Sequence, residues 1–154
     1  MKENDQLKKN MASKEKVFDS PDESVKTHIR AYAESKGEKG HIWRGQPTLL
    51  LTTRGRKSGK LRRTALIYGQ DGSNYLIVAS NGGSHGHPLW YLNLTENPEV
   101  EIQVGADKFA ARARTASEEE KPRLWKLMAE IFPRYDIYQA KAGRVIPLVI
   151  LEPV

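Results

Sequence analysis

The chain contains no cysteine, so it can form neither disulfide bonds nor thiolate metal sites. Long apolar runs are also missing. Nothing near the N-terminus resembles a signal peptide, and no segment approaches membrane-spanning length. These absences predict a cytoplasmic protein. With 154 residues, of which 38% are hydrophobic, the chain suits one compact domain with a single core.

Acidic residues are absent from one short stretch, residues 52–64, which reads TTRGRKSGKLRRT. It holds six cations, namely Arg54, Arg56, Lys57, Lys60, Arg62 and Arg63. The whole chain has 25 Lys and Arg against 19 Asp and Glu, so without these six the two signs would balance. The net charge of +6 is therefore concentrated in one segment, which is typical of a local anion-binding site.

The N-terminal residues 1–18 are mostly polar and charged, so we expect a mobile tail followed by one domain over 19–154. Ser20 and Pro21 have the form of a helix N-cap and a proline at the first helical position. Apolar residues follow at helical spacing, which predicts a helix over 21–35.

Short apolar and β-branched runs predict strands at 48–53, 61–69, 74–80, 100–104, 108–115 and 145–151. Asp71-Gly72 is a strong hairpin signal, so we expect the first three strands to form a meander. Because hairpins rather than long helical crossovers connect the strands, the sequence predicts a mainly β, α+β fold. Its architecture would be a small barrel of about six antiparallel strands with a few flanking helices.

Further helices are indicated by capping signals. Pro88 opens a short helix, and Ser117 and Glu120 form a capping box ahead of another helix, which Pro133 ends. Residues 135–142 add one or two helical turns. A Phe/Tyr stripe in this region is typical of core packing, although it could also line a site.

Three kinds of anion could explain the cationic stretch. A Walker-type phosphate loop is excluded, because Gly55 and Gly59 enclose only three residues and Leu61 stands where a hydroxyl should bind magnesium. A DNA minor-groove hook is disfavoured for two reasons. Strands are expected on both sides of the stretch, and the sequence has no second basic region that could contact a DNA duplex along its length. We therefore expect no nucleic-acid partner.

A phosphorylated, acidic cofactor is the third candidate, since arginine forks match phosphate and carboxylate geometry and lysine adds a mobile charge. The alternative is a solvated hairpin whose charges serve only solubility. No nearby acid in the sequence neutralises the stretch, which favours the cofactor.

Two histidines, His85 and His87, lie in a glycine-rich loop. They could meet one metal ion, but no third ligand is evident, so we expect no metal site. A position at the substrate entrance is the alternative for this pair.

Several strings, in this order and spacing, resemble the deazaflavin-dependent nitroreductase and quinone reductase family: LLLTTRGRKSGKLRRTALIY, VASNGG, PLWYLNLTENPEVEIQ, YDIYQ and IPLVILEP. The resemblance covers residues 49–153. It implies a split β-barrel oxidoreductase that uses coenzyme F420, a 5-deazaflavin with a phosphate and an oligoglutamate tail. Reduced F420 would pass a hydride to a quinone, an enone or a nitro compound.

The resemblance also implies the cofactor contacts. The phosphate and tail would lie at Arg56, Lys57 and Ser58. The strand beside the ring would contribute Arg62, Arg63, Thr64, Ala65, Leu66 and Ile67. The segment under the deazaflavin would be Val78, Ala79, Ser80 and Asn81. The helix that closes the site would contribute Leu89, Trp90, Tyr91, Leu92 and Asn93, and a further contact would be Tyr135.

Catalysis would need a hydrogen-bond donor for the oxyanion that develops on the acceptor. Our candidates are Ser80, Tyr135 and Tyr138. Ile67 and Phe132 stand where members that reduce menaquinone or nitroimidazoles can carry tyrosine. Other positions that depart from the family pattern are Asn81, often lysine, and Ala65, often proline.

Alternatives to this function are a reductase with flavin mononucleotide (FMN) as cofactor and a deazaflavin carrier without turnover. Peripheral membrane contact is left open by the lysine-rich N-terminus, since some relatives act on lipid quinones. We expect a monomer or a weak dimer.

Overall fold

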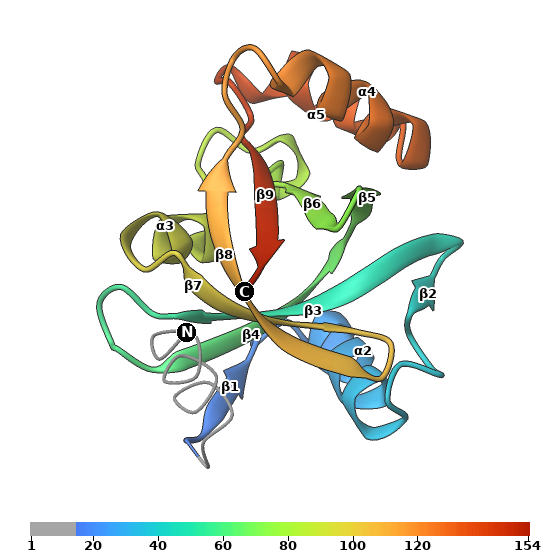
Figure 1. The fold of residues 1–154 in the computed structure, drawn as a ribbon, viewed down its shortest axis with the longest axis vertical. Coiled ribbons are helices and arrows are strands. Elements are labelled where there is room, and N and C mark those ends of the chain that lie inside the picture. The colour runs from blue at the N-terminus through green and yellow to red at the C-terminus, as the bar shows by residue number, and fades with distance from the viewer. Residues whose placement is uncertain (1–14) are drawn as a thin grey trace.

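The fold is that of a computed structural model, in which residues 15–154 are described (Figure 1). The strands are β1 (Val17–Asp19), β2 (Ile42–Trp43), β3 (Gln46–Arg54), β4 (Leu61–Ile67), β5 (Gly69–Asp71), β6 (Asn74–Val78), β7 (Glu99–Val104), β8 (Asp107–Thr115) and β9 (Leu148–Pro153). The helices are α2 (Glu23–Glu34), α3 (Leu89–Glu96), α4 (Lys121–Ile131) and α5 (Arg134–Ala142), with a short 3-10 turn, η1 (Asn81–Gly83). None of these helices is long and apolar enough to cross a membrane.

The strands form one sheet in the order β1-β4-β3-β7-β8-β9-β6-β5, with β2 paired to β3 outside this path. All these pairs are antiparallel except β1 and β4. Only Tyr68 separates β4 from β5, so the chain passes directly from the second strand of this order to the last. The sheet therefore curls into a barrel, which confirms the predicted fold class.

Alternation along β3 sets the two sides of the sheet. Leu49 and Leu51 face the main core cluster inside the barrel, together with Ile77, Ile102 and other residues of β6, β7, β8 and β9. Leu50 points the other way and packs against α2. A second cluster fills the space between α4, α5 and the strands β6 and β9. Figure 1 shows α4 and α5 at one end of the molecule and α2 at the other, with the sheet between them.

Helix α2 is bonded to the barrel through Tyr32, which is fully buried. Its hydroxyl lies 3.0 Å from the carbonyl oxygen of Thr48 and 3.2 Å from that of Gln103, and it accepts the N–H of Gly105 at 2.7 Å. Burial raises the pKa of Tyr32 to about 12. One side chain thus joins α2, β3 and the β7–β8 turn.

Several local predictions are confirmed. The Asp71-Gly72 signal marks a hairpin, in which Gly72 and Ser73 form the turn between β5 and β6. The capping box is reciprocal, because Ser117 N–H donates to Glu120 Oε1 at 2.8 Å and Glu120 N–H donates to Ser117 Oγ at 3.3 Å. The α-helical stretch begins directly after it, at Lys121.

Other predictions need correction. The polar tail was expected to extend to residue 18, but Val17–Asp19 form β1; the tail's residues 1–14 lie outside the described residues. The α2 N-cap is Asp22 rather than Ser20, because the Asp22 carboxylate accepts two backbone N–H groups of the first turn.

The meander prediction was wrong in its third strand, and the strand count was too low. The bend at Tyr68 leads β6 away from β4, and β6 pairs with β5 and β9 instead. Residues 15–154 form nine strands rather than about six, because β1, β2 and β5 have only two or three residues each and carry little sequence signal.

We expect Tyr32→Phe to lower the free energy of unfolding by about 1–3 kcal/mol, because the Gly105 N–H then loses its acceptor. Urea denaturation measures this change. Tyr75→Phe is the matched control: this half-buried tyrosine makes no hydrogen bond to a described residue, so its effect should stay within about 0.5 kcal/mol. Equal effects of the two substitutions would contradict the role of the Tyr32 hydroxyl.

Candidate active site

The main cleft of the described structure has a volume of about 680 Å³. It lies between β1, the loop that joins β3 to β4, and the segment from η1 to α3. Its lining residues are Phe18, Asp19, Ser20, Pro21, Thr53, Gly55, Arg56, Lys57, Ser58, Arg62, Arg63, Thr64, Asn81, His87, Pro88, Leu89, Trp90 and Asn93.

Residues 55–60 form a tight loop that carries the cationic stretch. The Gly55 N–H donates to the Lys60 carbonyl oxygen at 2.7 Å, and the Gly59 N–H donates to the Gly55 carbonyl oxygen at 2.8 Å. The Ser58 hydroxyl fills the concave side, where a Cβ at position 55 would lie only 2.6 Å from Ser58 Oγ. A side chain at position 55 would therefore require the Ser58 hydroxyl to move.

Asn93 of α3 fastens the loop to the barrel. Its side chain is almost fully buried. Its Oδ1 accepts the Arg56 N–H at 3.1 Å, and its Nδ2 donates to Thr53 Oγ1 at 3.2 Å. The loop backbone is thus fixed from the cleft side by one amide.

Two of the six cations are neutralised by acids from the N-terminal segment. Arg54 pairs with Glu15 and Arg63 pairs with Asp19, each at 2.6 Å. This corrects our interpretation that no nearby acid neutralises the stretch. The sequence could not indicate the acids, because β1 reaches β4 only through a parallel pairing across more than 40 residues.

The other four cations make no ion pair with any residue of the described range, namely Arg56, Lys57, Lys60 and Arg62. Lys60 and Arg62 lie over the ring of Phe18 at 5.1 and 5.5 Å, which supports them without cancelling their charge. The cleft therefore presents positive charge that lacks an anionic partner within the described part of the chain.

The segment that carries Asn81 and His87 to the cleft is held by Arg144, which no sequence pattern had indicated. Its guanidinium donates to the carbonyl oxygens of Ser84 at 3.0 Å, Ala79 at 3.3 Å and Ser80 at 3.1 Å. A further N–H donates to Nδ1 of His87 at 3.1 Å. Arg144 thus holds the whole segment 79–87 in place.

Helix α5 supports the same segment. Gly83 has a φ of +82°, and a Cβ there would lie 3.1 Å from Cα of Tyr138. His85 Nδ1 lies 2.6 Å from the carbonyl oxygen of Ala142. The two loop histidines therefore have separate partners, and residues 15–154 contain no group of three or more His, Asp or Glu able to hold a metal ion.

Ten of the nineteen cofactor positions implied by the resemblance line this cleft: Arg56, Lys57, Ser58, Arg62, Arg63, Thr64, Asn81, Leu89, Trp90 and Asn93. The other nine do not line it: Ala65, Leu66, Ile67, Val78, Ala79, Ser80, Tyr91, Leu92 and Tyr135. Ala65 instead packs toward α2, and Leu66 and Tyr91 pack against the barrel core. Direct contact of these residues with a cofactor stays a prediction.

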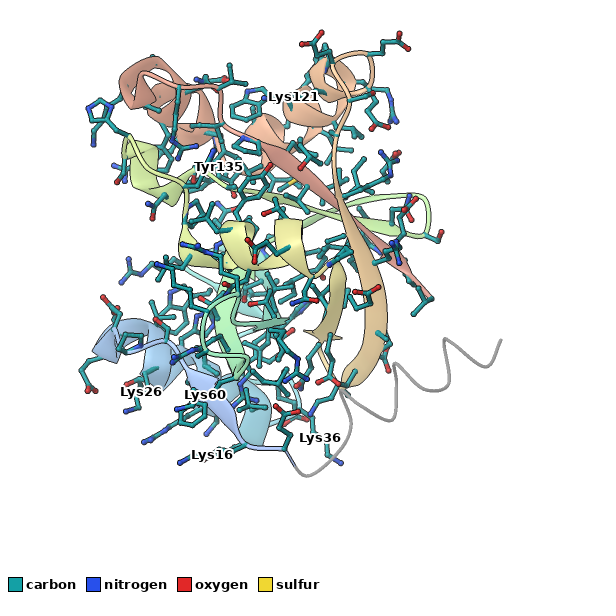
Figure 2. The ribbon with its side chains drawn as sticks, turned by 90° about the vertical axis from the view of Figure 1, so that its left-hand side faces the viewer. Lys16, Lys26, Lys36, Lys60, Lys121 and Tyr135 are labelled. Carbon is teal, nitrogen blue, oxygen red and sulfur yellow. The ribbon has the colours of Figure 1, made fainter. Side chains whose placement is uncertain are left out.

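The three residues proposed as catalytic also lie outside the cleft lining. Tyr135 is buried in the cluster under α4 and α5, where burial raises its pKa. Tyr138 packs against the same cluster, and Ser80 is 9% exposed. Figure 2 shows Tyr135 near the α4–α5 end and Lys60 toward the opposite end of the molecule. Their catalytic roles stay predictions.

Sequence reasoning missed eight lining residues: Phe18, Asp19, Ser20, Pro21, Thr53, Gly55, His87 and Pro88. Phe18 and Asp19 belong to β1, and Ser20 and Pro21 follow it. The sequence analysis had assigned Phe18 to the tail, and Ser20 and Pro21 to the start of the first helix. His87 was considered only as a metal ligand or an entrance residue. Its neighbours in the loop, three glycines and a proline, were the signal that it lies in a segment of defined conformation.

A curled, mainly antiparallel barrel whose main cleft is lined by cations and by apolar and aromatic residues is typical of the split-barrel oxidoreductases. The chain matches the sequence model of the F420H(2)-dependent quinone reductases over residues 24–153. It belongs to this family.

Similar proteins support the assignment. An F420H(2)-dependent quinone reductase of Mycobacterium tuberculosis is 41% identical over 131 residues, which cover 82% of this chain and 88% of that protein. A putative F420H(2)-dependent quinone reductase of Mycobacterium bovis has the same identity and coverage.

Two solved structures agree with the fold. An F420-H2 dependent reductase, FDR-A, has a TM-score of 0.64 and 42% identity, and the match covers 69% of this chain and 94% of that chain. A structure described as a domain-swapped dimer has a TM-score of 0.67 and 37% identity, and the match covers 86% of this chain and 100% of that chain.

We expect Asn93→Ala to loosen the loop, since the Arg56 N–H and the Thr53 hydroxyl both lose their partner. Amide hydrogen exchange at Arg56 should become faster, and the free energy of unfolding should fall by about 1–3 kcal/mol. Thr95→Ala on the same helix is the control, because that exposed hydroxyl bonds only to the Leu92 carbonyl oxygen. Unchanged exchange at Arg56 in Asn93→Ala would refute the anchoring role.

Proposed function

We propose that the protein is an oxidoreductase that takes a hydride from reduced coenzyme F420 and passes it to a quinone. The observation that carries the proposal is the set of four cations that have no acidic partner among residues 15–154, gathered on a short loop and strand beside the cleft. Concentrating like charges costs energy, and a polyanionic phosphate and glutamate tail would offset that cost.

The loop residues fit such a tail. The backbone N–H groups of Lys57 and Ser58 donate no hydrogen bond to a described atom, so both are available to an anion. The side chains of Arg56 and Lys57 line the cleft beside them. Successive N–H groups in a tight turn form a concave anion site, and the cations would add charge-assisted bonds.

The other wall of the cleft fits an aromatic ring system. Pro88, Leu89 and Trp90 offer apolar and aromatic surface, and Asn81 adds an amide. When bound, the deazaflavin would supply a two-electron hydride, which no side chain can store. The chain's own part would be to bind the tail, orient the ring edge and limit the access of water.

The acceptor would be a small quinone, and enones and nitro compounds are further candidates. Leu89 is 71% exposed at the cleft, so an apolar acceptor could approach there. The side chains of Ile67 and Phe132 carry no hydroxyl group. Acceptors whose reduction depends on a tyrosine at either position would therefore react slowly.

We do not favour the alternatives. FMN has a single phosphate, which would leave most of the four cations without a partner. We place the protein in the cytoplasm as a monomer or weak dimer, with any membrane contact at the surface and no nucleic-acid partner.

The charges can be tested by reversal. We expect Arg56→Glu/Lys57→Glu to raise the Kd for F420 by about 100-fold or more at low salt, since charge-assisted bonds contribute about 1.5–3 kcal/mol each. The loss should shrink at high salt. Quenching of tryptophan fluorescence reports the binding.

The control, Lys39→Glu/Lys126→Glu, changes the net charge equally at two exposed lysines outside the cleft lining. Its Kd should stay within about threefold of the unmodified protein, because exposed charges at a distance are screened. An equal rise in the Kd for F420 in the two double variants would mean that only the overall charge attracts the ligand. That result would refute the proposed site.

An enzyme would oxidise bound reduced F420 when an acceptor is added, whereas a carrier would only bind it. We expect reduced F420 bound to the protein to be oxidised when menadione is added, with a change in deazaflavin absorbance that scales with enzyme concentration. FMN in place of F420 should support no comparable rate. Tight binding without oxidation, across a panel of quinones, enones and nitro compounds, would instead identify a carrier.

A further inference from the structure

We propose that His87, held by Arg144 as the neutral tautomer with its proton on Nε2, donates a hydrogen bond to the oxygen of the acceptor that becomes negative during reduction. This role rests on the proposed function. It adds a substrate-contacting residue to the site, and it makes Arg144 a positioning residue that acts through His87.

The contact between Arg144 and His87 decides the tautomer. A guanidinium nitrogen only donates hydrogen bonds, and Nη1 of Arg144 lies 3.1 Å from Nδ1 of His87. Nδ1 must therefore be the acceptor, and the single proton of the neutral ring is on Nε2. His87 is exposed overall, but local desolvation and the positive charge of Arg144 lower its pKa, which disfavours the doubly protonated ring.

The Nε2–H group has no partner of its own. His87 lines the cleft, and no described residue accepts a hydrogen bond from Nε2. The ring is confined by Tyr91, whose centroid lies 4.9 Å away and whose hydroxyl is bonded to Thr115 at 2.9 Å. A donor is thus fixed in orientation before any ligand arrives.

The guanidinium of Arg144 also binds the backbone of the segment 79–87. Its nitrogens donate to Ser84, Ala79 and Ser80 carbonyl oxygens in addition to His87. Its charge therefore fixes the segment 79–87 and the histidine ring in one arrangement. Arg144, which follows α5 in the sequence, thus supports a segment that contributes lining residues without lining the cleft itself.

The reduction of a quinone creates the need for such a donor. The quinone gains a hydride from the reduced deazaflavin, which loses two electrons, and becomes a hydroquinone anion. One proton from water then completes the hydroquinone. A neutral imidazole N–H stabilises the anionic oxygen in the meantime and is unchanged at the end.

The tautomer can be measured without cofactor. Side-chain ¹⁵N spectra of the unmodified protein at pH 8 should show His87 with Nδ1 unprotonated and Nε2 protonated, as one species. Arg144→Gln should give a mixture of tautomers, because the guanidinium no longer fixes the ring. A proton on Nδ1 in the unmodified protein would overturn the proposal.

The role in turnover is tested with His87→Phe and His87→Gln. The phenylalanine keeps a ring without a donor, whereas the glutamine amide can replace the Nε2–H. With menadione, we expect kcat to fall about 100-fold in His87→Phe and less than about tenfold in His87→Gln. The Kd for F420 should change less than about threefold in both variants.

The outcomes separate the two proposals. If the unmodified protein neither binds F420 nor oxidises its reduced form, the proposed function fails and the acceptor role of His87 fails with it. If the unmodified protein is active and His87→Phe keeps its kcat, only the role of His87 is overturned. A loss of F420 affinity that equals the loss of kcat would assign His87 to cofactor binding instead. Thermal unfolding of each variant checks that the fold is intact.

Discussion

The cleft depends on holding four like charges together against their mutual repulsion. The antiparallel pairing of β3 and β4 fixes both ends of the loop, and the backbone bonds of Gly55 and the amide of Asn93 fix its path. Two further cations are used differently: Arg54 and Arg63 pair with acids of the N-terminal segment and help to dock β1. The stretch thus divides into two cations paired with acids and four cations that form no ion pair with a described residue.

The segment 79–87, on the second wall of the cleft, is held by a single charged side chain. A single guanidinium collects three carbonyl oxygens and one imidazole nitrogen, so Arg144 replaces the hydrogen bonds that regular secondary structure would give residues 79–87. Both walls are therefore held by hydrogen bonds within the described structure. Rigid walls bind and orient a ligand at a smaller entropic cost, which suits a site whose main task is positioning.

The sequence predicted correctly those features that depend on interactions between neighbouring residues. Asp71-Gly72 and the Ser117 capping box were confirmed, since their interactions span only a few residues. The family and the barrel followed from ordered strings of residues. The role of Arg144 and the pairing of Asp19 with Arg63 were missed, because both join segments more than 40 residues apart, which no periodicity reveals. The pairing of β6 with β9 was missed for the same reason.

The most direct test compares F420 with the same deazaflavin lacking the phosphate and the glutamates, at equilibrium and low salt. If the unpaired cations bind the acidic tail, the complete cofactor should bind at least about 100-fold more tightly, and added salt should reduce the difference. Equal affinities for the complete and the truncated compound, independent of salt, would contradict the account, since the ring alone would then explain the binding.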